Sequence, residues 1–152
     1  MKKTSFFVAV FIVSVATVFA QDVIEVGRLA GQVEALKPIL EQAEKEKDFL
    51  DKLTYDSVCD LYTFTYNRWK IANLMYQIDI QSLGLRDTKG LKGDYLKGVQ
   101  NQNKETKARI TEMRKQIVAA KAENDRILQR GRLKKENKKL DEYIASASAI
   151  GR

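Results

Sequence analysis

The chain has 152 residues, with 27 lysine and arginine side chains against 20 aspartate and glutamate side chains, and it has no histidine. This length suits one domain, and the net charge of +7 at pH 7 indicates nucleic acid, an anionic surface or an acidic protein as a partner. The lack of histidine removes the commonest general base and a favoured metal ligand, which argues against an enzyme.

The first 20 residues have the pattern of a secretory signal peptide. Lys2 and Lys3 precede an apolar run, 6–18, that ends in Val-Phe-Ala at 18–20. The run is shorter than the roughly 20 residues that a bilayer span needs. We therefore expect cleavage after Ala20, export to the periplasm or outer surface of a bacterial cell, and one mature domain, 21–152. Export argues against nucleic acid as the partner.

A long helix is predicted over residues 23–81. In its first part apolar residues recur at steps of three and four, as in a heptad repeat in which Lys47 fills one position: Val26, Leu29, Val33, Leu36, Leu40, Ala43 and Leu50. Pro38 lies outside this seam, so we expect a kink or a new helix start near Lys37 and no chain reversal there. In 55–80 two overlapping apolar stripes follow helical spacing, so the helix is expected to continue to about residue 81.

A glycine-rich loop is predicted over 82–98, because four glycines fall within fifteen residues: Gly84, Gly90, Gly93 and Gly98. A second helix is predicted over 99–145. Its heptad seam contains Ile110, Met113, Ile117, Ala120 and Ile127. Asn124 occupies a seam position, where a buried asparagine costs stability but restricts register and oligomeric state.

The charge distribution predicts that the two arms lie antiparallel. Residues 21–80 hold seven basic and eleven acidic side chains, a net charge of −4, whereas 81–152 hold eighteen basic and nine acidic ones, a net charge of +9. A reversal within 82–98 brings the opposite charges together, and the predicted inter-arm pairs involve Glu44, Asp48, Asp51, Arg126, Arg130, Lys134 and Lys138. The fold class is therefore all-α, a long antiparallel helical hairpin or coiled coil.

The aromatic stretch 55–80 is predicted to contact a partner. The second arm offers too few apolar residues to cover both stripes, so the surplus surface is expected to bury against another protein or a second copy. The predicted interface residues are Tyr55, Tyr62, Phe64, Tyr66, Trp69, Met75 and Tyr76. Cys59, the one cysteine, is expected to be either a buried thiol or part of an intermolecular disulfide.

Two known classes resemble parts of this pattern. The signal peptide, basic mature chain and long helical arms are similar to the Skp/OmpH class of periplasmic chaperones, which implies a holding chaperone for outer-membrane proteins. That class has β-strands near both mature ends, whereas here VIEV at 23–26 is a weak strand candidate. The segment GQVEALKPILEQAEKEKDFLDKL, 31–53, resembles the opening arm of fusobacterial FadA-type adhesins, which implies a helical-hairpin surface adhesin.

The sequence predicts a non-enzymatic, exported coiled-coil protein that serves as a structural or assembly subunit of a bacterial envelope or filament. The chaperone and the adhesin are the alternatives. We predict no catalytic, cofactor-binding or metal-binding residues and no small-molecule substrate. The expected partner is a protein, a second copy in a homo-oligomer, or both. An anionic envelope surface is a further possible contact for the basic run 126–139.

Overall fold

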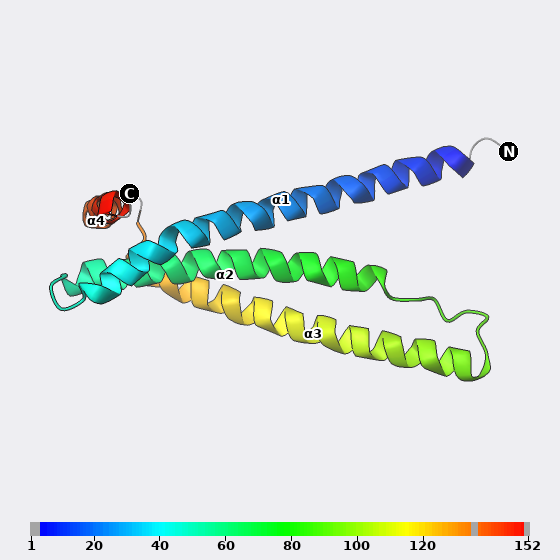
Figure 1. Ribbon diagram of the computed structural model, residues 1–152. Coiled ribbons are helices and arrows are strands. Elements are labelled where there is room, and N and C mark those ends of the chain that lie inside the picture. Colours follow the sequence, from blue (N-terminus) through cyan, green and yellow to red (C-terminus); the bar gives the residue numbers. More distant parts are fainter. Residues whose placement is uncertain (1–3, 135–136, 151–152) are drawn as a thin grey trace.

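A computed structural model of the chain describes the backbone of residues 4–134 and 137–150, and the side chains of 20–134 and 137–149. The described regular structure is entirely helical, as predicted. Its four helices are α1 (Thr4–Lys45), α2 (Lys52–Leu83), α3 (Gly93–Arg130) and α4 (Lys138–Ile150) (Figure 1). Except for Ala20, the side chains of the predicted leader lie outside the described part, and 23–26 belongs to α1.

The helix α2 is the centre of the molecule. It packs against both α1 and α3, which run in the opposite direction to α2 (Figure 1). Among the residues that the structure describes, α1 and α3 do not pack against each other. The prediction of a single hairpin is therefore wrong in one respect, because the first arm itself folds back. The apolar seam of α1 contains the buried residues Leu29, Val33 and Ala43, and α2 covers this seam in place of the second arm.

The chain reverses at 46–51, where one continuous helix over 23–81 was predicted. The Glu46 carbonyl accepts hydrogen bonds from the amides of Phe49 (2.8 Å) and Leu50 (2.9 Å), which closes the turn. Asp51 then caps α2: its carboxylate accepts from the Thr54 amide at 3.0 Å and from the Thr54 hydroxyl at 2.7 Å. The cap fixes a new helix start, so α1 and α2 are separate elements. No new helix begins near Lys37, because α1 runs through Pro38 to Lys45.

The predicted loop 82–98 is real but shorter, and it spans 84–92. Gly90 and Gly93 have φ values of 82° and 63°, a region that glycine enters without steric cost. Asn103 holds the loop against α3, because its side chain donates to the Arg86 carbonyl at 2.7 Å and accepts from the Arg86 amide at 3.0 Å. Helix α3 starts at Gly93, six residues earlier than predicted.

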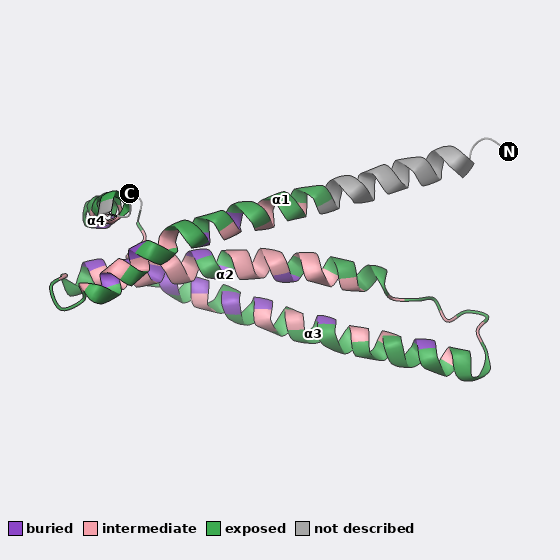
Figure 2. Cartoon of the chain, in the orientation of Figure 1, coloured by how far each residue is buried: buried purple, intermediate pink, exposed green. Residues whose placement is uncertain are grey.

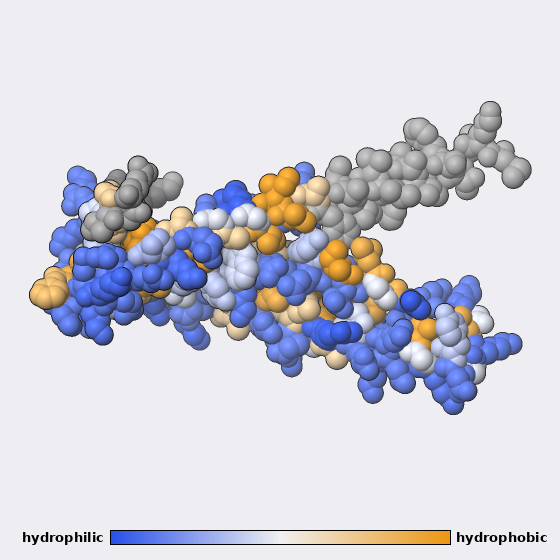
Figure 3. Space-filling view, viewed as in Figure 1, coloured by the Kyte–Doolittle hydropathy of each residue, from blue (hydrophilic) through white to orange (hydrophobic). Residues whose placement is uncertain are grey.

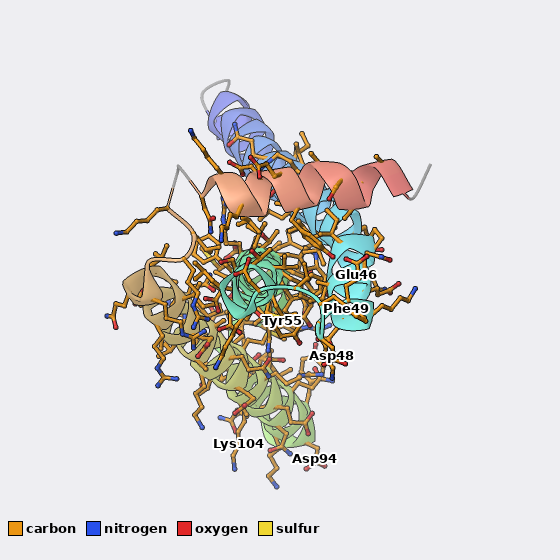
Figure 4. The ribbon with its side chains drawn as sticks, turned by 90° about the vertical axis from the view of Figure 1, so that its left-hand side faces the viewer. Glu46, Asp48, Phe49, Tyr55, Asp94 and Lys104 are labelled. Atoms are coloured by element: carbon orange, nitrogen blue, oxygen red, sulfur yellow. The ribbon has the colours of Figure 1, made fainter. Side chains whose placement is uncertain are left out.

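The second predicted helix, 99–145, is also two elements. Gly131 ends α3 with a φ of 71°, in the left-handed conformation that is common after a helix C-terminus. After the link, α4 crosses the end of the molecule where α1 turns into α2 (Figure 4). Leu140 of α4 completes a buried cluster with Ile39, Ala43 and Val58. Figure 2 shows buried residues at this end and along the inner face of α3.

Candidate interaction surface

Three aromatic side chains form a ladder along one face of α2. Tyr62, Tyr66 and Trp69 follow the steps of four and three residues that place side chains on one side of a helix. The rings of Tyr62 and Tyr66 are stacked, with centroids 6.3 Å apart, and those of Tyr66 and Trp69 are tilted, with centroids 5.4 Å apart. Tyr66 remains 38% exposed, and the other two are half-buried. We call these three residues the aromatic ladder.

A pocket of about 200 Å³ lies between the aromatic ladder and α1. Ala30 and Val33 of α1 give it an apolar wall, while Glu34 and Lys37 bring charged groups to it. A pocket of this kind, apolar inside with a few polar groups, suits an inserted apolar side chain whose flanks carry charge. The pocket beside the aromatic ladder is therefore a candidate contact site.

The other predicted interface residues lie elsewhere. The Tyr55 hydroxyl donates to the Glu44 carboxylate at 2.6 Å, and this hydrogen bond raises the pKa of Tyr55. Phe64 and Tyr76 are half-buried, and Met75 is exposed. Nine residues, or about two and a half turns, separate Tyr66 from Met75, so the two side chains leave α2 on opposite sides. The structure therefore divides the predicted set between different surfaces.

The surplus apolar surface that motivated a partner is partly covered within the chain. Thr54, Val58 and Thr65, which follow helical spacing along one stripe of α2, are buried. Helix α2 packs against both α1 and α3, so α1 adds cover that the prediction did not include. The prediction counted α1 and α2 as one arm and so left α1 out of the cover for α2. The expectation that the surplus surface, which includes the exposed Met75, contacts a partner stays a prediction.

Opposite charges meet where the start of α2 approaches the end of α3. The buried Asp60 accepts from Arg130 at 2.6 Å and from Arg132 at 3.3 Å, and Arg132 also pairs with Asp56 at 3.1 Å. Nearby, Asn137 donates to the hydroxyl of the buried Ser57 at 3.3 Å. These contacts tie the link before α4 to α2.

Some of the charged residues that were predicted to pair between the arms form such pairs, and others do not. Arg130 reaches Asp60, and Asp51 pairs with Lys139 at 3.7 Å. Arg126 instead pairs with Glu123 of its own helix at 3.3 Å. Glu44 bonds Tyr55, and no ion pair among the described residues involves the remaining three: Asp48, Lys134 and Lys138. Lys135, part of the basic run, lies outside the described residues.

The predicted seam asparagine is confirmed. Asn124 is 8% exposed, and its side-chain oxygen accepts a hydrogen bond of 3.1 Å from the Asn67 amide group. Its own amide donates to the Phe64 carbonyl at 3.4 Å. The partner helix α2 belongs to the same chain, so this asparagine pair restricts the register of α3 on α2.

Cys59 is half-buried, and burial raises the pKa of its thiol. A raised pKa lowers the fraction of reactive thiolate at neutral pH. The two expectations for Cys59, a buried thiol or an intermolecular disulfide, both remain predictions.

A second pocket, of about 270 Å³, was missed by the sequence analysis. It lies between α2 and α3 and is lined by Met75, Ile78, Asp79, Arg114, Ile117 and Lys121. Lys107, Arg114 and Lys121 recur every seven residues on α3, a spacing that gives one straight row with steps of about 10.5 Å. This seven-residue spacing is visible in the sequence and could have been used to predict the site. We call these three residues the basic row.

The open end of the molecule also has apolar surface. Val23 and Ile24 of α1 and Ile80 and Leu83 of α2 are between 44% and 69% exposed, and Figure 3 shows apolar surface in these regions. Within the part of the chain whose side chains are described, no helix has the length and apolarity of a membrane span.

No protein-family model, no curated protein and no solved structure matches this chain.

Proposed function

We propose that this chain is an exported, non-enzymatic structural or assembly subunit of a bacterial envelope or filament, and that it acts through protein–protein contacts. The observation that supports this proposal is the aromatic ladder beside its pocket. Tyrosine and tryptophan are enriched among the residues that carry most of the binding energy at protein interfaces. In this ladder Tyr66 remains 38% exposed, although α2 packs against both α1 and α3.

The proposal also includes the way in which the long helices pack against each other. We infer that the pairs α1–α2 and α2–α3 pack as antiparallel coiled-coil hairpins. Most buried or half-buried positions of α3 between Val99 and Ile127 support this, because they follow a heptad; the exceptions are 116 and 123. The heptad positions are 99, 103, 106, 110, 113, 117, 120, 124 and 127.

Photocrosslinking tests the role of the aromatic ladder. A benzophenone amino acid is placed at Tyr66 in one strain and at Tyr95 in another, since Tyr95 is an aromatic on α3 that is 63% exposed and far from the ladder in sequence. Irradiation of intact cells is expected to give a defined, stoichiometric adduct from position 66 and none from position 95. Equal adducts from both positions, or none from position 66, would contradict the proposal.

A holding chaperone is a second candidate, supported by the basic row, whose three cations form no ion pair with the described residues. Such a surface suits acidic segments of an unfolded client. The test is suppression of aggregation of an unfolded outer-membrane protein at increasing salt, because screening weakens contacts between exposed charges. A chaperone should protect at low salt and lose this ability at high salt, whereas a structural subunit should form assemblies that survive salt.

A further inference from the structure

The two pockets described above differ in chemical character and open on opposite sides of α2. The pocket beside the aromatic ladder contains rings, Glu34 and Lys37, whereas the second pocket contains Met75, Asp79, Arg114 and Lys121. Half a turn separates Tyr66 from Met75 around the helix axis, after two full turns. One molecule therefore presents an aromatic surface with acidic flanks on one side and a basic surface with an exposed methionine on the other.

The acidic flank continues beyond the first pocket. Glu34 and Glu41 lie seven residues apart on α1, and both are exposed. Neither carboxylate pairs with a cation among the described residues. Two unpaired carboxylates on α1 thus repeat the spacing of two unpaired cations on α3, Arg114 and Lys121.

We propose that the basic surface of one molecule binds the aromatic surface of a second copy of this chain. Met75, which is 53% exposed, enters the pocket beside the aromatic ladder of the second copy. A thioether packs favourably against aromatic rings. Around it, Arg114 and Lys121 face Glu34 and Glu41, and the cations also lie over the exposed ring of Tyr66.

One further charged residue in each pocket supports the same pairing. Lys37 is the cation of the first pocket, and Asp79 is the carboxylate of the second. Lys37 of one copy can therefore face Asp79 of the other, while Arg114 and Lys121 face Glu34 and Glu41. Because the two surfaces differ, the contact is heterologous, and every added copy leaves one free surface of each kind. Such contacts give rings or open filaments. This inference rests on the proposed function, since it names the partner of the same aromatic site.

Charge reversal tests the contact. One variant carries Glu34→Lys and Glu41→Lys, and another carries Arg114→Glu and Lys121→Glu. In sedimentation of protein purified from the cell envelope, each variant alone is expected to self-associate at least about tenfold more weakly than the wild type, because like charges then face each other. An equal mixture of the two variants, and a chain carrying all four changes, are expected to regain assembly because opposite charges face each other again.

The matched control reverses two charges away from both pockets, Lys115→Glu and Arg126→Glu, whose partners Glu112 and Glu123 lie on the same helix. This control is expected to assemble like the wild type, and circular dichroism checks the helix content of every variant. Loss of assembly in both single-surface variants without recovery in the mixture would overturn the inference, as would a wild type that stays monomeric at about 100 μM. If the wild type stays monomeric while position 66 crosslinks to another protein, the proposed function stands and this inference fails.

Discussion

At the scale of residues, buried polar pairs set how the helices align. Apolar seams tolerate sliding by a heptad, but a buried amide that loses its partner keeps the full cost of its desolvation. Asn67 with Asn124, and Asp60 with Arg130 and Arg132, join α2 to residues about 57 to 72 positions later in the chain. These contacts therefore select one register out of several that the apolar residues alone would accept.

The asparagine pair yields the first prediction. Asn124→Leu leaves the buried Asn67 amide without this partner, so the free energy of unfolding should fall by about 1–3 kcal/mol. Replacing both residues by leucine should cost much less, because no polar group is then left buried and unpaired. Urea denaturation measures both values. Asn101→Leu, at an exposed position of α3, serves as the control and should change stability by less than about 0.5 kcal/mol. A single variant that behaves like this control would contradict the role of the pair.

Because of two tyrosines, we predict that the folded chain loses stability at alkaline pH. Burial and the hydrogen bond to Glu46 raise the pKa of Tyr143 to about 12, and the hydrogen bond to Glu44 raises that of Tyr55. The folded state therefore holds both phenol protons more tightly than the unfolded chain, whose tyrosines titrate near pH 10. This stabilisation is complete below about pH 10 and is lost as the pH rises through the raised pKa of each tyrosine.

The variant with Tyr55→Phe and Tyr143→Phe lacks this stabilisation at neutral pH and should lose less stability between pH 10 and 12 than the wild type. Thermal unfolding followed by circular dichroism measures the difference, and absorbance at 295 nm reports the phenolates directly. Parallel alkaline curves for the two proteins would show that these hydrogen bonds contribute nothing.

At the scale of elements, the sequence predicted helices well and one reversal poorly. Gly90 and Gly93 predicted the α2–α3 loop because their positive φ angles need glycine. The turn at 46–51 has neither glycine nor proline, and the heptad phase continues through Leu50, so pattern alone favoured an unbroken helix. The available signal was Asp51 as an N-cap, with Leu50 and Tyr55 at the two positions of a hydrophobic staple. Periodicity shows which face of a helix is buried but does not show which helix buries it.

Among the described side chains of α4, Leu140 is the one that is buried, and this gives a prediction for the helix. Leu140 is 5% exposed within the cluster that also contains Ile39, Ala43 and Val58. Leu140→Ala removes a large part of the apolar contact of a short helix, and buried leucine truncations cost about 2–5 kcal/mol. Hydrogen exchange should therefore show loss of amide protection in α4, while the amides at the α2–α3 seam keep theirs. Ser148→Ala, at an exposed position, is the control, and equal exchange in the two variants would refute the expectation.

At the scale of the whole molecule, the helices form a layer in which α2 separates two different surfaces. The sequence located the aromatic residues of the candidate site but not their division between surfaces. That division depends on the turn at 46–51, because this turn determines which side of α2 is covered by α1. The basic row was visible as a spacing of seven residues, yet its meaning required knowing that α3 covers α2 on one side only.

Chemical crosslinking tests the contact between α4 and the start of α2. A carbodiimide joins a carboxylate to a lysine in direct contact, and Lys139 lies 3.7 Å from Asp51. Mass spectrometry of the crosslinked monomer should therefore identify a peptide pair that connects 51 with 139. Lys139→Arg keeps the charge but removes the reactive amine, so the pair should vanish, whereas Lys138→Arg should leave it in place. A crosslink from Lys139 to the 84–92 loop of the same molecule would contradict the fold.

The topology also determines the order in which the molecule is built. Each long helix pairs with the helix next to it in the chain, through the short connections 46–51 and 84–92. Local pairings of this kind close quickly, because little chain entropy is lost before contacts form. A chain that emerges with its N-terminus first can therefore close α1 on α2 before α3 is available. Only α4, whose binding site on α1 and α2 lies far back in the sequence, must wait for the last residues, and it completes the molecule.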